Sequence, residues 1–315
     1  MLRRVADHLF WAARYVERAE WRARLADVNY HLLVEGGATS AQSWAVLLAI
    51  TGEAELFSRH YDTAEEEPVL NFLAFDDRNS SSIRCCIDAA RSNLHSLRHL
   101  VSSELWLEIN SLYLDSRAWS FELFETRGVY AFFQEIKGRF WAVAGICEST
   151  LPRDPTYDFW QLGLMLERAD NVSRLLDVKY HLLLPGVEAV GGPIDLLQWA
   201  AVLRSASGLE AYRRIWGNSI RIDRVVQLLL FDPTFPRSAR FCVDRMENAL
   251  ERIANFCDGN DAPRPIAATG NLARILSERG AREVIIGGLH EFLLDLQKEC
   301  ARVGDSLFEE YLRFE

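Results

Sequence analysis

Apolar residues recur every three or four positions along much of the chain. In the segment 161–183 they fall at positions 162, 165, 166, 169, 172, 176 and 183, and this helical period predicts an amphipathic helix. Proline, glycine and polar residues interrupt the pattern near 35–37, 152–155, 191–193 and 258–265, where we expect loops. No stretch of useful length alternates apolar and polar residues as a half-buried strand would. The pattern therefore predicts an all-α fold.

Related segments occur in the two halves of the chain. Glu17-Arg18-Ala19, within 13–36, corresponds to Glu167-Arg168-Ala169, within 163–186. A second correspondence relates 73–88 to 229–244, each of which contains a Phe-Asp dipeptide. Such internal repetition is typical of folds assembled from similar units. We predict a helical bundle built from two tandem-duplicated helical units, 1–150 and 151–315, that form one body.

The two Phe-Asp segments are the clearest predicted loops, because each lies just before a new apolar-periodic run. Pro236 suits the first turn of the helix that follows the second segment. Asn79 or a nearby serine is expected to cap the corresponding helix in the first half. The segments also repeat a set of charged residues, Asp76, Arg84, Asp232 and Arg240.

Charged residues spaced three and four apart fall on one face of each repeated helix. The first set is Glu17, Glu20, Arg24, Asp27 and His31, and the second set is Glu167, Asp170, Arg174, Asp177 and His181. A solvated face is one interpretation. However, each member keeps its chemical type between the copies, whereas neighbours such as Trp21 and Asn171 differ. The pattern favours a polar network that joins helices in the interior, and a binding site is the alternative.

Arg18 and Arg168 lie on the apolar stripes of the same helices, one heptad before Leu25 and Leu175. A buried guanidinium keeps its charge, so it requires a carboxylate or several carbonyl oxygens as partners. These partners could come from the Phe-Asp segments or from the other half of the chain. A docking point for the carboxylate or phosphate of a substrate is the alternative.

Composition excludes several classes of function. The chain has 315 residues, and 35 basic residues against 45 acidic ones give a net charge of −10, which argues against a nucleic-acid partner. No apolar run is long enough for a membrane span, and the N-terminus does not resemble a signal peptide. The six cysteines show no metal-binding spacing and are expected to be reduced core residues. We therefore expect a cytoplasmic protein without a membrane contact.

Two Asp-x-x-x-His pairs on the repeated helices are candidate metal ligands. The pairs Asp27/His31 and Asp177/His181 have a spacing that would let both side chains face one ion. Arg24 and Arg174 lie one turn away and would repel a cation, so no metal is expected. The sequence contains none of the nucleotide-binding, zinc-protease or nucleophile-elbow motifs, and no cofactor is expected.

The sequence resembles the Alpha-E family of bacterial proteins. The resemblance rests on the repeated Glu-Arg helix, the FD…RS-x-R segments, SSELW followed by Asn110, and GLHEFLLDLQ at 288–297. It covers essentially the whole chain, with departures at 76–79 and at Trp21. The resemblance implies an α-helical protein whose genes neighbour, or are fused to, a circularly permuted ATP-grasp ligase. Transglutaminase-like and proteasome-like peptidases are further implied neighbours, so the implied context is peptide ligation or modification.

Two functions follow as expectations. The first is a non-catalytic helical partner of the ATP-grasp ligase, or a component that presents its peptide substrate. The alternative is an enzyme of the same pathway, with Glu17 or Glu167 as acid or base. In that enzyme the adjacent histidines and arginines would position an anionic substrate. Buried and fully paired Glu-Arg residues would favour the first, and an open cleft between the two helices would favour the second. The sequence leaves the oligomeric state open.

Overall fold

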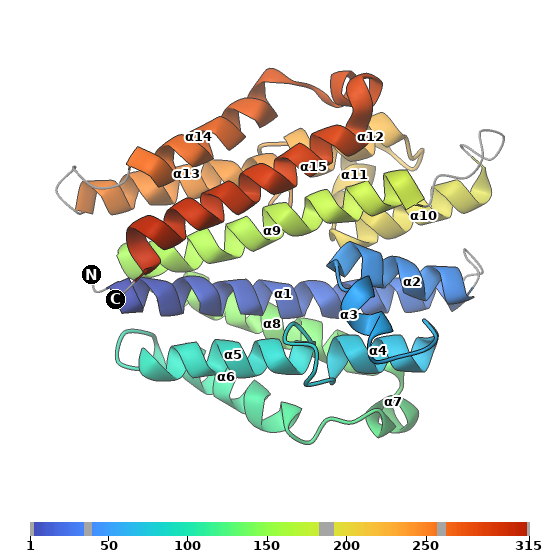
Figure 1. Ribbon diagram of the computed structural model, residues 1–315, viewed down its shortest axis with the longest axis horizontal. Helices are drawn as coiled ribbons and strands as arrows, with labels where there is room; N and C mark the ends of the chain where they lie inside the picture. Colours follow the sequence, from blue (N-terminus) through green and yellow to red (C-terminus); the bar gives the residue numbers. More distant parts are fainter. Residues whose placement is uncertain (1–2, 35–39, 183–191, 257–262, 314–315) are drawn as a thin grey trace.

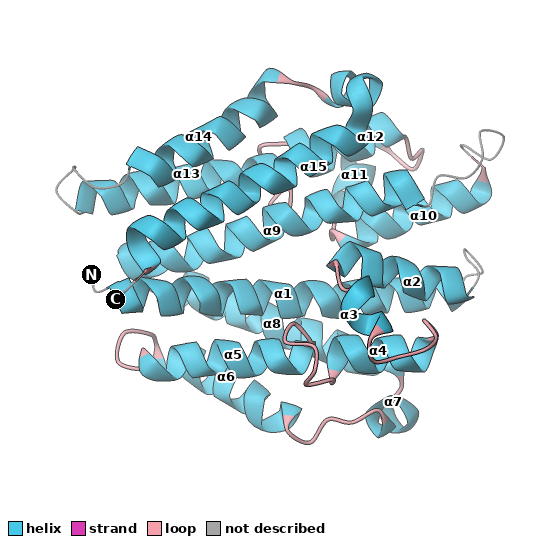
Figure 2. Ribbon diagram, in the orientation of Figure 1, coloured by secondary structure: helices cyan, strands magenta, loops and turns pink. Residues whose placement is uncertain are grey.

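The computed structural model describes residues 3–34, 40–182, 192–256 and 263–313, and within these ranges the chain is helical and has no strand (Figure 2). The first half contains α1 (Arg3–Val34), α2 (Ser40–Thr51), α3 (Ala54–Ser58), α4 (Glu66–Ala74), α5 (Ile83–Ser96), α6 (Ser103–Ser116), α7 (Glu122–Arg127) and α8 (Val129–Thr150). The all-α prediction is confirmed.

The second half begins with the long helix that carries the second Glu-Arg dipeptide. Its elements are α9 (Pro155–Leu182), α10 (Pro193–Ser205), α11 (Leu209–Trp216), α12 (Ile222–Val226), the π-helical turn η2 (Gln227–Phe231), α13 (Ala239–Phe256), α14 (Pro263–Glu278), α15 (Ala281–Leu307) and the π-helical turn η3 (Phe308–Leu312). Of the predicted breaks, 152–155 and 193 coincide with helix starts, whereas 35–37, 191 and 258–262 lie outside the described residues.

The two long helices α1 and α9 lie side by side in the middle of the molecule (Figure 1). They run in the same direction, since Gly163 lies against Phe10 and, further along both helices, Arg168 lies against Glu17. The approach is close, because a Cβ atom added at Gly163 would stand 2.1 Å from the carbonyl oxygen of Phe10. Glycine at this position therefore allows the two backbones to meet.

Each central helix has its own set of packing partners. α1 packs against α5 and α8, and α9 packs against α13 and α15. Figure 1 shows α5 to α8 on one side of the central pair and α13 to α15 on the other. Buried apolar residues of both halves belong to one continuous core. The division into two duplicated units stays a prediction, and these packing relations are consistent with it.

Short polar residues fix the beginnings of several helices. Ser82 caps α5 by accepting a hydrogen bond from the backbone N–H of Cys85 at 3.2 Å. The cap of this helix is therefore one of the serines near Asn79, as predicted, and not Asn79 itself. Ser238 accepts from the N–H of Phe241 at 3.0 Å and begins α13. Pro236 therefore precedes this helix rather than lying in its first turn, because the serine supplies the cap. No helix in the described ranges is both long and apolar enough to cross a membrane.

Candidate functional site

The Glu-Arg dipeptides of α1 and α9 bind one another reciprocally. Arg168 donates from Nε and Nη2 to the two carboxylate oxygens of Glu17 at 2.9 and 2.7 Å. Arg18 donates in the same bidentate manner to Glu167, at 2.6 and 3.0 Å. The glutamate of each half thus holds the arginine of the other half. We call these two contacts the Glu-Arg pairs.

A second arginine reaches each glutamate. Arg237, in the turn before α13, donates to Glu17 at 3.0 Å. Arg14, one turn before Arg18 on α1, donates to Glu167 at 2.7 Å. Only 3 % of each of the two glutamates is exposed. Every carboxylate oxygen of the Glu-Arg pairs is therefore hydrogen-bonded to a guanidinium in the interior.

These contacts decide the protonation of the glutamates. Burial alone would raise the pKa of Glu17, but the positive charges of Arg168 and Arg237 outweigh it and lower this pKa to about 2. The same balance, with Arg18 and Arg14, lowers the pKa of Glu167 to about 2. Both carboxylates are ionised at neutral pH. A group with this pKa is a poor general acid or base at neutral pH, since efficient proton transfer requires a pKa near the working pH.

The remaining charged residues on the α1 face form a buried network with α8 and α13. Glu20 pairs with Arg24 on its own helix and accepts from Arg237 at 3.2 Å. Asp27 accepts from Lys137 of α8 at 2.6 Å and lies 3.7 Å from Nε2 of His31. Glu17, Glu20, Arg24 and Asp27 of the predicted set are therefore brought together in the interior. His31 is partly exposed at the edge of this network.

The matching face of α9 is less buried. Arg174 donates to Asp170 at 2.8 Å within the helix. Asp177 contacts Nδ1 of His290, on α15, at 2.5 Å. The side chain of His181 lies outside the described residues. In the part of the chain that the structure describes, no group of three or more His, Cys, Asp or Glu side chains is arranged to hold a metal ion.

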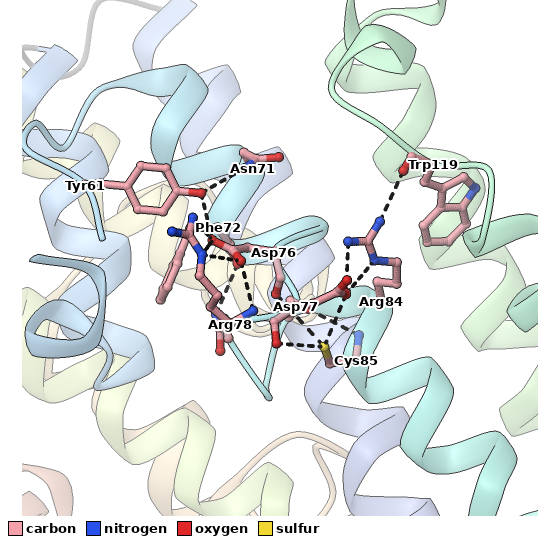
Figure 3. Close-up of polar contacts among 11 residues, drawn as sticks. Tyr61, Asn71, Phe72, Asp76, Asp77, Arg78, Arg84, Cys85 and Trp119 are labelled. Atoms are coloured by element: carbon pink, nitrogen blue, oxygen red, sulfur yellow. Dashed lines mark hydrogen bonds and ion pairs between the residues drawn. The ribbon is translucent and has the colours of Figure 1, made fainter. Parts of the chain in front are cut away.

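The Phe-Asp carboxylates do not reach the Glu-Arg arginines, which corrects one of the two expected sources of partners. Figure 3 shows the carboxylate of Asp76 turned toward Arg78 and the hydroxyl of Tyr61. Arg84 instead contacts Asp77 at 3.0 Å and the carbonyl oxygen of Trp119 at 3.3 Å. Asp76 is bound by Arg78 only two residues along, so its charge is neutralised within the loop.

The second Phe-Asp segment behaves in the same way. Asp232 accepts from the backbone N–H groups of Thr234 and Phe235 at 2.7 and 3.1 Å, which stabilises the turn itself. Arg240 pairs with Asp244, one helical turn away, at 2.7 Å. The segment contributes to the Glu-Arg pairs through Arg237 and through the carbonyl oxygen of Pro236, which accepts from Arg168 at 3.2 Å, rather than through its aspartate.

Sequence reasoning missed several partners of the candidate residues. The missed residues are Arg14, Arg237, Lys137 and His290. Two of them carried a signal, because Arg14 lies one turn from Arg18 and Lys137 is a charge within a mostly apolar helix. The other two depend on how α13 and α15 pack against the central helices, which no local pattern specifies.

Comparison with known proteins places the chain in a family. The model of the Alpha-E family, a predicted α-helical domain with a conserved ER motif, matches residues 1–312. Uncharacterised proteins of Mycobacterium tuberculosis strain H37Rv and of Mycobacterium bovis are 23 % identical over 314 residues, which cover 93 % of this chain and 34 % of theirs. The chain thus spans about a third of the length of these relatives. No solved structure matches. The chain belongs to the Alpha-E family.

Proposed function

We propose that the protein is a non-catalytic helical partner, or substrate-presenting component, of an ATP-grasp-linked peptide ligation system. The link to an ATP-grasp ligase rests on the family resemblance. The non-catalytic role is supported by one observation, the burial and complete pairing of Glu17 and Glu167. Removing one member of such a pair would leave an uncompensated buried charge, so each group is needed by the packing of the two helices. The alternative, an enzyme with these glutamates as acid or base, has less support because both are held ionised.

An open groove offers a place for a partner peptide. It has a volume of about 570 Å³ and lies between α1, α8 and the junction of α10 with α11. Tyr130 and Trp141 of α8 line it, and about half of each side chain surface is exposed. His31 lies edge-on to the Tyr130 ring, with 5.0 Å between the centroids. Exposed aromatic rings beside charged groups are typical of surfaces that bind peptides.

The length of the relatives also favours a partner role. This chain matches only 34 % of each of the three mycobacterial proteins. In those proteins the Alpha-E region is therefore one part of a longer polypeptide. A region that lies next to others in one chain is well placed to act on, or with, a neighbouring domain.

Affinity capture from a lysate of the source organism tests the proposal. The tagged protein is expected to recover an ATP-grasp ligase at low salt, identified by mass spectrometry. Tyr130→Ala is expected to reduce the recovered amount. Phe308→Ala serves as the matched control, because Phe308 is a similarly exposed aromatic residue outside the groove. Recovery of no ligase and no peptide-processing enzyme, or equal loss with both variants, would contradict the proposal.

A further inference from the structure

A polar cavity of about 380 Å³ lies beside the Arg18–Glu167 pair, between α1, α9 and the end of α2. Its walls carry an excess of positive charge, with one more guanidinium group than carboxylate group. The charged lining residues are Arg14, Arg18, Arg22, Arg174, Glu53, Glu167 and Asp170.

The carboxylates of the cavity are already bound by arginines. Glu53 accepts two hydrogen bonds from Arg22, at 2.5 and 2.7 Å. Asp170 accepts from Arg174, and Glu167 belongs to the Glu-Arg pairs. Because these carboxylates are already paired, the hydrogen-bonding groups left over in the cavity are donors. An anion that entered would meet N–H groups rather than unpaired carboxylate oxygens.

Two buried donors in this lining have no acceptor. They are Nε of Arg22 and Nδ2 of Asn171, and these residues are only 4 % and 8 % exposed. Buried polar groups are nearly always hydrogen-bonded in folded proteins. The two donor atoms are covered by protein, but their residues line one cavity together with four guanidinium groups. An anion that entered this cavity would lie among donors, and a small movement of either side chain would give its orphaned N–H an acceptor.

Gly52 lies beside the guanidinium of Arg174 in the lining of the cavity. Gly52, which follows α2, has a φ of +72°, and a Cβ atom at this position would stand 3.5 Å from Nη1 of Arg174. A positive φ of this size favours glycine at position 52. Trp21 and Ile50 supply apolar surface in the same lining.

The corresponding space beside the Arg168–Glu17 pair is different. There the second guanidinium that reaches Glu17 comes from Arg237, in the turn before α13, whereas the one that reaches Glu167 comes from Arg14 of α1. The position aligned with Arg237 in the first half is Ser81, whose hydroxyl lies 3.5 Å from Nη1 of Arg18. None of the described residues that line this second space has an orphaned buried donor. The space in the second half is smaller, about 270 Å³ against about 380 Å³, and Arg237 is among its lining residues.

We propose that the cavity beside Arg18 binds an anionic group, a carboxylate or a phosphate, of a small ligand. The volume equals that of about twelve water molecules, so it admits a ligand larger than a bare ion. The oxygens of the anionic group accept from Arg22, Asn171 and Arg174, and the remainder of the ligand packs against Trp21. This site is separate from the peptide groove, and its existence does not depend on the proposed partner role.

Isothermal titration calorimetry of the purified protein tests the site, with inorganic phosphate and glutarate as probes at low ionic strength and neutral pH. Saturable binding of at least one probe is expected. Arg174→Gln and Asn171→Leu are expected to weaken it by about tenfold or more, since each removes a hydrogen bond to a charged group. Binding of phosphate alone assigns a phosphate ligand, and binding of glutarate alone assigns a carboxylate ligand.

The control is Arg240→Gln. Arg240 lies outside the cavity and forms a comparable ion pair, at 2.7 Å, with Asp244 one helical turn away. The affinity of this variant for the probes is expected to stay within about twofold of the wild-type value. Circular dichroism melts establish that the variants fold. Arg174→Gln alone decides the outcome if Asn171→Leu does not fold, because Arg174 is partly exposed and its ion pair lies within its own helix. No saturable heat up to about 10 mM of either probe, or equal affinity in Arg174→Gln and the control, would overturn the proposal.

Discussion

Arg168→Met is the most informative single substitution, because it removes the charge of a Glu-Arg pair and keeps most of the stem. It abolishes both hydrogen bonds to Glu17 and the one to the carbonyl oxygen of Pro236, at 3.2 Å. Breaking a buried ion pair costs about 3–5 kcal/mol. Arg237 still reaches Glu17 at 3.0 Å, so we expect the lower end of this range, about 3 kcal/mol.

This loss is measurable as a thermal shift. At roughly 2 °C per kcal/mol for a chain of this size, the midpoint of thermal unfolding falls by about 6 °C. The unfolding midpoint of Arg168→Lys is expected to lie between those of the wild type and Arg168→Met. Lysine keeps the positive charge, but an ammonium group cannot make the planar bidentate contact. Arg18→Met is expected to resemble Arg168→Met, because Glu167 likewise retains a second arginine.

Arg302→Met is the control for these melts. Arg302 is 69 % exposed and, among the described residues, its ion-pair partner is Glu299, one turn away, so its removal should change stability by less than about 0.5 kcal/mol. Differential scanning calorimetry at neutral pH supplies the comparison. If Arg168→Met melted within about 1 °C of the wild type, the Glu-Arg pairs would not hold the two helices together, and a recognition role for the arginine would replace our interpretation.

Three further outcomes are expected. Gly163→Ala should destabilise the protein by about 1–3 kcal/mol in denaturant titrations, since its Cβ would clash with Phe10, whereas Gly138→Ala, in open space within α8, should be neutral or stabilising. The folded-state pKa values of the two paired glutamates are depressed to about 2, so the stabilisation that they contribute is present above their unfolded pKa and is lost as the pH falls. The melting temperature of the wild type should therefore drop between about pH 5 and pH 3. The drop should be smaller in Arg168→Met. Burial raises the pKa of the five described thiols, but only Cys85 among them is half-buried and the other four are buried. In a Cys257→Ser background, native protein at pH 8 should therefore react with a disulfide reagent mainly at Cys85 and slowly at Cys86, Cys147, Cys242 and Cys300; equal rates would contradict this.

Helical periodicity predicted the fold class and the burial of the central helices, because both follow from the local order of apolar residues. The apolar positions of the helical period on α9, such as Leu162, Leu166 and Val172, are buried as this period predicts. The need of Arg18 and Arg168 for carboxylates also followed from the sequence, since both lie on apolar stripes. These predictions concern what a residue requires, and they need no knowledge of tertiary packing.

The identity of the partners did not follow from the sequence. Glu17 faces Arg168 only because α1 and α9 run in the same direction at a close approach permitted by Gly163. The Phe-Asp carboxylates were equally plausible by charge, but Asp76 is neutralised within its loop by Arg78. Contacts between helices depend on packing angle and register, which the order of apolar residues leaves undetermined.

The same reason explains the partner of Asp177. The carboxylate of Asp177 contacts His290 of α15, a residue more than a hundred positions away in the sequence. The side chain of His181, one turn from Asp177 on α9, lies outside the described residues. A local spacing rule identifies candidates within one helix, and a helix packed from a distant part of the chain supplies a contact that the rule cannot include.

The central claim, that the Glu-Arg pairs are structural ion pairs and not an acid–base apparatus, is tested most directly by the titration of Glu17 and Glu167. Selective ¹³C labelling of glutamate side-chain carboxyls, with assignment by Glu17→Gln and Glu167→Gln, follows each group by nuclear magnetic resonance. Because arginine charges lower both pKa values to about 2, neither carboxyl signal should shift between pH 7 and about pH 4 while exposed glutamates begin to titrate. A titration midpoint above about pH 5 for either residue would contradict the account and favour a catalytic role.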